Sequence, residues 1–388
     1  MVCEKLPRNT RHLFFSGLLV VMAGCSAGMP GDPCANGCAD IADDFDPGPP
    51  PAPPAPPASL AVADYTAVSL GGGGGGGDGA MATGINNLGQ IVGAITPTFM
   101  RDVAVSWTVS ESAVVSRQVL GTLAAGNHSR AMGINDLGQV VGWYSDGSDR
   151  RPFVWTADGG MLDLGVPTGF PGANAYDIND AGQVAGVIFP RLDGVWEVSF
   201  NGRFMVWTVD QRGMPTSEQD MGTLGGEHAA ALGINSSGKA AGTSYRDDLL
   251  RPTGLIWSAS EGILELDGFT EVVAINDFDE LAGNSEGRDS GFFWSPADGF
   301  MEIPEGIPAD LNNSSQVVGT TFSTIDDGIG AASSAFIWET GEAKVLPPPP
   351  PTEIGWHSYH ATAINDAGWV VGYSAPDWQA IVWIPNTP

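Results

Sequence analysis

The chain has 388 residues and a formal net charge of −29, because 45 acidic residues face only 16 lysines and arginines. A nucleic-acid-binding protein needs a basic footprint for phosphates, so this charge argues against that class and against contact with anionic lipid headgroups. The acidic excess is typical of a soluble body outside the cytoplasm, or of one that meets cations or basic partners.

The first 24 residues have the form of a lipoprotein signal peptide. A basic start precedes an apolar stretch, from Leu13 to Val21, that is too short to span a bilayer comfortably. The run VMAGC then resembles a bacterial lipobox, in which Cys25 is lipidated and becomes the mature N-terminus. An ordinary secretory signal cleaved nearby is the alternative. We expect an exported protein that is lipid-anchored to the bacterial outer membrane, on its periplasmic or cell-surface side, or secreted.

Residues 25–60 are first acidic and then rich in Pro and Ala. Such a segment cannot bury a core, so it predicts a disordered tether with a semi-rigid Pro-rich part. Cys34 and Cys38 are the pair of cysteines that remain once Cys3 is removed and Cys25 is lipidated. Export favours a disulfide between them, and a metal site made of two thiols without a nearby His is the weaker alternative.

Residues 61–388 repeat one unit seven times. Every copy has an Asn, a Gly seven residues later and a Trp 18 to 28 residues later, and successive copies are 36 to 56 residues apart. Strand-like repeats of this length indicate a β-propeller. The marker asparagines are Asn86, Asn135, Asn179, Asn235, Asn276, Asn312 and Asn365.

Each unit contains the pattern of two hairpins. In the second copy we expect strands at 131–135, 139–144, 152–155 and 161–165. Asn135 opens a type I turn, and Gly138 accepts the positive φ that ends it. Asp279 and Ser315 replace this Gly in the fifth and sixth copies. Four successive antiparallel strands form one twisted sheet, which is a propeller blade.

The last copy ends without its fourth strand, whereas an unmatched strand pattern at residues 64–70 precedes the first copy. Pairing the two would remove an exposed sheet edge. The predicted fold is therefore all-β: a seven-bladed β-propeller of four-stranded antiparallel blades, closed by an N-terminal strand that joins the last blade.

The units VLGTL, GIND-GQVVG and DMGTLGG resemble those of the HAF-repeat family of probable extracellular proteins. The resemblance covers nearly all of residues 64–388 and implies a repeat protein outside the cytoplasm, without implying an activity. The His of the family's own tripeptide is absent in every copy: Arg151-Pro152 and Gln379-Ala380, for example, stand in its place.

The sequence contains few residues that indicate a catalytic, metal or ligand site. An Asp follows several marker asparagines, but a calcium site needs six to eight oxygens, usually from several acidic positions of one loop. We therefore interpret these residues as parts of turns, and expect no metal, cofactor or catalytic residues. If a ligand site exists, the connections between units are its expected place, because three of the histidines lie there. The candidate ligand-binding residues are His128, Arg130, Glu227, His228, Trp356 and His357, together with Trp196 and Phe200 in a long insertion at 188–203.

A second long insertion is expected at 320–334.

Taken together, these features favour a monomeric binding or interaction module with a protein or glycan partner. Two alternatives stay open: a hydrolase that uses the His-bearing face of the propeller, and a purely structural surface protein.

Overall fold

The computed structural model describes residues 61–72, 79–97, 101–110, 113–123, 128–145, 147, 149–189, 202–226, 228–246, 252–266, 268–285, 290–324, 331–349 and 358–386. Within these ranges no helix is long and apolar enough to cross a membrane. The predicted signal peptide and tether, residues 1–60 with Cys25, Cys34 and Cys38, lie outside the described residues, as do Trp196, Phe200, Glu227, Trp356 and His357.

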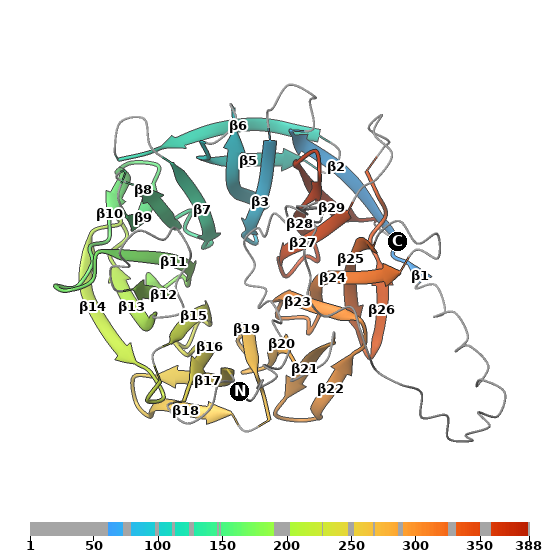
Figure 1. The fold of residues 1–388 in the computed structure, drawn as a ribbon. Coiled ribbons are helices and arrows are strands. Elements are labelled where there is room, and N and C mark those ends of the chain that lie inside the picture. The colour runs from blue at the N-terminus through green and yellow to red at the C-terminus, as the bar shows by residue number, and fades with distance from the viewer. Residues whose placement is uncertain are drawn as a thin grey trace, which may run out of the picture. The chain divides into compact units, whose positions relative to one another are not determined.

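The described strands form seven sheets arranged as a ring, so the predicted seven-bladed β-propeller is confirmed (Figure 1). Blade 1 consists of β3 (Gly79–Ile85), β4 (Gln90–Thr96), β5 (Val103–Ser110) and β6 (Ala113–Gly121). Blade 2 consists of β7 (Ser129–Ile134), β8 (Val140–Ser145), β9 (Arg150–Thr156) and β10 (Gly160–Asp163). Blade 3 consists of β11 (Gly172–Ile178), β12 (Gln183–Phe189), β13 (Arg203–Val209) and β14 (Pro215–Gly222).

The remaining blades follow the same antiparallel order. Blade 4 consists of β15 (Ala229–Ile234), β16 (Ala240–Tyr245), β17 (Pro252–Ser258) and β18 (Gly262–Leu266). Blade 5 consists of β19 (Glu271–Ile275), β20 (Leu281–Asn284), β21 (Gly291–Ser295) and β22 (Gly299–Ile303). Blade 6 consists of β23 (Gly306–Leu311), β24 (Val317–Thr324), β25 (Ala331–Glu339) and β26 (Glu342–Val345). Blade 7 consists of β27 (Ser358–Ile364), β28 (Val370–Ala375), β29 (Gln379–Pro385) and β2 (Tyr65–Gly71).

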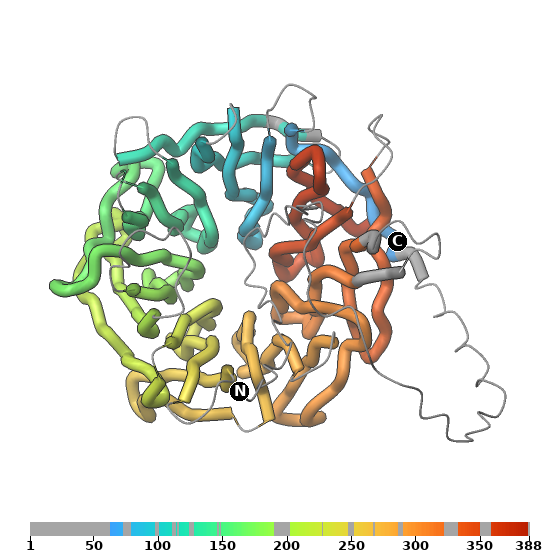
Figure 2. Tube along the Cα trace, viewed as in Figure 1, coloured from blue at the N-terminus to red at the C-terminus, as the bar shows by residue number. Residues whose placement is uncertain are grey.

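The two ends of the propeller chain close the ring as predicted. Strand β2 pairs antiparallel with β29, with Val68 opposite Val382. The blue N-terminal strand therefore lies beside the red C-terminal blade in both views (Figures 1 and 2). One further strand was not predicted: β1 (Ala61–Val62) adds to the outer edge of β26 in parallel, so blade 6 has five strands. It covers an edge that would otherwise be unpaired.

Each blade bends at the same place on its innermost strand. A register shift, for example between Ala175 and Asp177 in β11, marks a bulge three residues before the marker Asn. The bulge brings a backbone carbonyl of the inner strand against the Gly of the second strand. A Cβ on Gly186 would lie 2.1 Å from the carbonyl oxygen of Asn174, and the corresponding distance is between 1.8 and 2.1 Å in all seven copies. This contact explains why every copy has Gly there.

The apolar core lies between the blades. Buried hydrophobic residues of the described part fall into seven clusters, and each cluster joins two neighbouring blades. Trp207 of β13, for example, is fully buried in the cluster that also contains Val141 and Val154 of blade 2. A single four-stranded sheet buries too little to be stable, so the ring is held by these contacts.

The expected loop at 320–334 needs correction. Strands β24 and β25 pair as far as Thr324 opposite Ala331, so most of this stretch is an extended hairpin. At 188–203, Ile188 and Phe189 end β12 and Arg203 begins β13. The residues between them, 190–201, lie outside the described ranges.

Candidate functional site

The antiparallel order divides the connections between two ends of the ring. The turns that join the first and second strands of each blade lie at one end, here called the turn end. The connections from the second to the third strand, and from each blade to the next, lie at the opposite end, here called the loop end. The two ends use their polar residues differently.

At the turn end, the seven marker asparagines form a closed circle of hydrogen bonds, here called the Asn belt. The side-chain amide of each Asn donates to the backbone carbonyl of the marker Asn in the next blade, at distances between 2.8 and 3.1 Å, and Asn365 closes the circle by donating to Asn86. All seven side chains are buried. The predicted marker is thus a contact between blades as well as a turn residue.

The same asparagines hold their own turns. In blade 3, the Oδ1 of Asn179 accepts from the backbone N–H of Gln183 at 3.0 Å, and its Nδ2 also donates to the Gln183 side chain at 2.9 Å. The Gly182 N–H donates to the Asn179 carbonyl, and Gly182 has a φ of 76°. The predicted turn with a final left-handed residue is therefore confirmed, and Asp279 and Ser315 have the same conformation, with φ of 60° and 58°.

The residue after the marker Asn takes part in a second, outer set of bonds, here called the outer circle, which is found at six of the seven blade interfaces. The carboxylate of Asp180 accepts the backbone N–H of Asp136 at 2.9 Å, and that of Asp136 accepts the N–H of Asn87 at 2.8 Å. Asp277 does the same for Ser236, and these bonds lower the pKa of the Asp277 carboxyl although burial opposes the shift. In the described part of the chain, no three acidic, His or Cys side chains form a group that could hold a metal ion.

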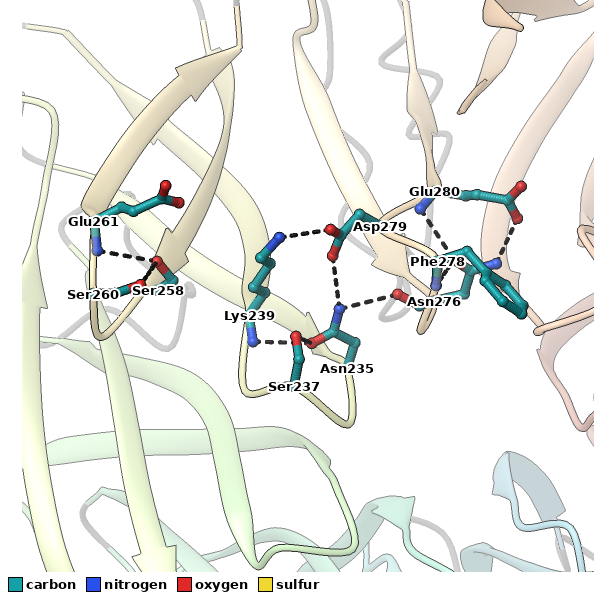
Figure 3. A network of polar contacts seen from close by, with 10 residues as sticks. All are labelled: Asn235, Ser237, Lys239, Ser258, Ser260, Glu261, Asn276, Phe278, Asp279 and Glu280. Atoms are coloured by element: carbon teal, nitrogen blue, oxygen red, sulfur yellow. Dashed lines mark hydrogen bonds and ion pairs between the residues drawn. The ribbon is translucent and has the colours of Figure 1, made fainter. Parts of the chain in front are cut away.

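The two turns that lack glycine, at Asp279 and Ser315, contact a different side chain of the preceding blade; Figure 3 shows the contact at Asp279. In three copies a Gln four residues after the marker covers the turn Gly of the next blade; a Cβ on Gly238, for example, would lie 2.6 Å from Gln183. Lys239 replaces this Gln in blade 4, and its Nζ lies 2.6 Å from the carboxylate of Asp279. Glu280 replaces it in blade 5 and accepts from the Ser315 hydroxyl at 2.7 Å. The non-glycine residues therefore pair with non-Gln partners across the blade interface.

Two inner strands carry a desolvated carboxylate at the bulge. Asp310 accepts the N–H of Leu311 in its own blade and, at 2.9 Å, the N–H of Ile364 in the next. Asp177 makes the equivalent pair of bonds in blade 3. Burial raises the pKa of Asp310 to about 7, although the two N–H donors oppose the shift. These two carboxylates link neighbouring blades, so we interpret them as structural residues.

At the loop end, arginine and tryptophan side chains of blade 2 form an arginine–tryptophan cluster, defined as Arg130, Trp143 and Arg150. The guanidinium carbons of Arg150 and Arg130 lie 4.2 Å and 5.7 Å from the centre of the Trp143 ring. Arg130 also forms an ion pair with Asp102 of blade 1. The Asp102 backbone N–H donates to Nδ1 of His128 at 3.3 Å, so two of the predicted site residues meet through one Asp.

Blade 7 contributes aromatic rings to the same end. His360 stacks on Tyr373 with 4.8 Å between centroids, and Tyr373 stacks on Trp378 at 5.4 Å. His360 also bonds to Thr320 of blade 6 at 3.1 Å. Burial raises the pKa of Tyr373, and the positive charge of Arg130 opposes that shift, so the side chains of blades 2 and 7 interact electrostatically.

His228, another predicted site residue, belongs to blade 4. Its ring lies edge-on to Tyr245 with 5.1 Å between centroids, and burial lowers its pKa to about 4. It is therefore neutral at physiological pH. Glu271 of blade 5, which lies near Tyr245, has its pKa raised by burial and accepts from Asn284 at 2.9 Å.

Within the described residues, buried side-chain atoms without a hydrogen-bond partner occur in both halves of the ring. The indole N–H groups of Trp107, Trp207 and Trp338 lie in the turn-end half of their strands. Every buried side-chain oxygen without a partner, in contrast, lies at the loop end. None belongs to the Asn belt. Buried polar atoms are normally satisfied by protein or by ordered molecules, so such groups need an explanation. They are Thr122 Oγ1, Asn174 Oδ1, Thr243 Oγ1, Tyr245 OH, Asn284 Oδ1 and Ser285 Oγ.

Sequence reasoning selected Arg130, His128 and His228 but missed Trp143, Arg150 and Tyr373. Trp143 and Tyr373 occupy the same position of the repeat, eight residues after the marker Asn, directly opposite Arg130 and His360 on the neighbouring strand. The available signal was that polar and aromatic residues replace aliphatic ones at this position in some copies, and the repeat alignment could have revealed it.

Comparisons with known proteins support the fold alone. No protein-family model and no curated protein matches the chain. Among solved structures, it is similar to virginiamycin B lyase from Staphylococcus aureus, with 11% identity and a TM-score of 0.51 over 82% of this chain and 99% of that one. It is also similar to the β-propeller domain of the trilobed protease from Pyrococcus furiosus, with 12% identity and a TM-score of 0.52 over 79% and 93% of the two chains. At such low identity these similarities say nothing of activity.

Proposed function

We propose that the chain is an exported β-propeller, anchored through a lipid on Cys25, that binds a partner at its loop end and has no catalytic role. The observation that supports binding is the position of the buried side-chain oxygens that lack partners. The marker asparagines at the turn end bond from blade to blade, whereas these oxygens lie at the loop end. Buried oxygens normally have a hydrogen-bond partner, which a bound group can supply.

The membrane anchor rests on the sequence of the first 25 residues. The whole chain has only 16 basic residues against 45 acidic ones, which disfavours attraction to an anionic membrane, so a covalent lipid would have to supply the attachment. We expect the purified chain to have an intact mass that begins at an acylated Cys25. Cys25→Ser should move the protein from the membrane to the soluble fraction, and an unchanged membrane fraction would contradict the anchor.

Binding at the loop end is tested with arrays of glycans and peptides, probed with the full chain. A ligand that binds the wild type should be lost with Arg130→Ala at the loop end. Asp180→Ala at the turn end is the matched control, because it removes one exposed charged side chain that contacts its neighbour blade. Loss of binding with Asp180→Ala and not with Arg130→Ala would contradict the proposal.

A further inference from the structure

Arg150 differs from the other half-buried arginines of the described chain. Arg130, Arg151 and Arg246 each form an ion pair, with Asp102, Asp163 and Glu265. Arg150 has no carboxylate within ion-pair distance among the described residues, and its guanidinium stacks on Trp143 at 4.2 Å. A guanidinium stays charged in a protein, and the carboxylate that attracts Arg150, Asp102, is already ion-paired with Arg130, so Arg150 is a partly desolvated cation without a carboxylate of its own among the described residues. This is unexpected in a chain with a net charge of −29.

The surroundings of Arg150 make that charge costly. Burial lowers the pKa of Arg150 and the neighbouring charge of Arg130 lowers it further, while Tyr176 and Asp102 oppose the shift. Both guanidinium groups lie over the same indole, which is itself 8% exposed. Leaving a partly buried charge unpaired is destabilising. A residue that weakens the fold in this way is expected where a bound group supplies the missing charge.

A hydroxyl and an amide from blade 3 lie beside this cation. Tyr176 interacts electrostatically with Arg150, and its hydroxyl oxygen accepts from the Nδ2 of Asn174 at 3.1 Å. The hydroxyl hydrogen of Tyr176 is thereby left to donate to a further acceptor. The Asn174 side chain is 2% exposed, and its Oδ1 has no hydrogen-bond partner in the described structure. The location thus offers several donors, one positive charge and one free acceptor.

We propose that Arg150, with Tyr176 beside it, binds the carboxylate of a small, singly charged ligand at the loop end. A guanidinium presents two parallel N–H groups that match the two oxygens of a carboxylate. A singly charged ligand is favoured over phosphate or sulfate because the acidic protein repels multiple negative charge. Asn174 Oδ1 would accept from a hydroxyl or amide group next to that carboxylate. This inference rests on the proposed binding role and specifies its ligand.

The test titrates the full chain with acetate, with the neutral isostere acetamide and with phosphate, and follows binding by calorimetry and chemical-shift changes. Acetate should bind the wild type, acetamide should bind at least tenfold more weakly, and phosphate should bind more weakly than acetate. Arg150→Met should reduce acetate binding at least tenfold, and Arg150→Lys should reduce it because the fork of donors is lost. Arg151→Met is the control, since Arg151 is adjacent in sequence but paired with Asp163; it should bind like the wild type.

Three outcomes would overturn the inference: equal acetate binding by wild type and Arg150→Met, tighter binding of phosphate than of acetate, or no acetate binding up to molar concentration. None of these would contradict the proposed function if an array ligand is still lost with Arg130→Ala. If Arg150→Met does not fold, the lysine variant alone decides. The inference and the proposed function fail together only if Arg130→Ala and Arg150→Met both bind every ligand as the wild type does.

Discussion

The two ends of the propeller differ in how closely the seven copies of the repeat agree. At the turn end, all seven copies use the same Asn, with the same bond to the next blade. At the loop end, the equivalent positions hold pairs as different as Arg130 with Trp143 and His360 with Tyr373. The residues that close the ring are the same in every copy, whereas the loop-end positions, which the ring does not need in order to close, differ from copy to copy.

Substitution in the Asn belt should have the largest effect on stability. Asn179→Ala removes bonds to Asn235 and Gln183 and leaves the Gln183 N–H without its acceptor, while the Asn235 carbonyl still accepts from Gly238. We expect the free energy of unfolding to fall by about 2–4 kcal/mol, measured by urea denaturation. Asp180→Ala, one residue further and exposed, should cost less than about 1 kcal/mol. Equal losses for both variants would remove the distinction between the belt and the outer circle.

The stability contributed by Asp310 should depend on pH. Its folded pKa is raised to about 7, mainly by burial, with Asp177 and Asp366 adding repulsion. A raised carboxyl pKa means that the folded state binds the proton more tightly, so this contribution is complete below the unfolded pKa and is lost as pH rises through about 7. Relative to Asp310→Asn, the wild type should therefore become less stable between pH 5 and pH 8 in urea denaturation. A difference between the two proteins that does not change with pH would contradict this assignment.

The exceptional pair at the turn end should be coupled. Lys239→Gln with Asp279→Gly recreates the Gln–Gly pair found at three other blade interfaces, whereas each single change leaves one partner unmatched. Both side chains are about one third exposed. We therefore expect a coupling energy of only about 0.5–1 kcal/mol in a double-mutant cycle of unfolding free energies. Additive effects of the two substitutions would mean that Lys239 and Asp279 contribute to stability independently of each other.

At the loop end, substitution should change stability least. Arg150→Met removes an unpaired charge, so the unfolding free energy without ligand should stay within about 0.5 kcal/mol of the wild type or rise. Arg151→Met breaks the ion pair with Asp163 and should lose up to about 1 kcal/mol. A clear loss in Arg150→Met, larger than that of Arg151→Met, would make Arg150 a structural residue.

Much of the fold could be predicted because its signals repeat. The marker Asn, the Gly seven residues after it and the Trp set the number of blades, and the missing last strand indicated closure by residues 64–70, most of which lie in β2. Strand β1 could not be predicted, because two residues, Ala61 and Val62, carry no period. The long hairpin of β24 and β25 was taken for a loop, since its Ser, Thr and Gly residues are common in loops.

The candidate site was harder to predict than the fold. Arg130 was selected as a neighbour of His128, whereas Arg150 was missed because nothing in a sequence shows which arginines find a carboxylate. The pairing of Arg151 with Asp163, and of Arg130 with Asp102, depends on how adjacent strands and blades meet. The Asn belt was likewise read as a set of local turns, because bonds between copies 36 to 56 residues apart leave no local pattern.

Hydrogen exchange of the backbone amides tests the central claim, a closed frame at the turn end, most directly. In each blade the N–H four residues after the marker Asn donates to that Asn, from Gln90 in blade 1 to Trp369 in blade 7. These seven amides should exchange at one common, slow rate in the full chain, and all should accelerate together in Asn179→Ala. Protection that differs from blade to blade, or acceleration confined to blade 3, would contradict a closed belt.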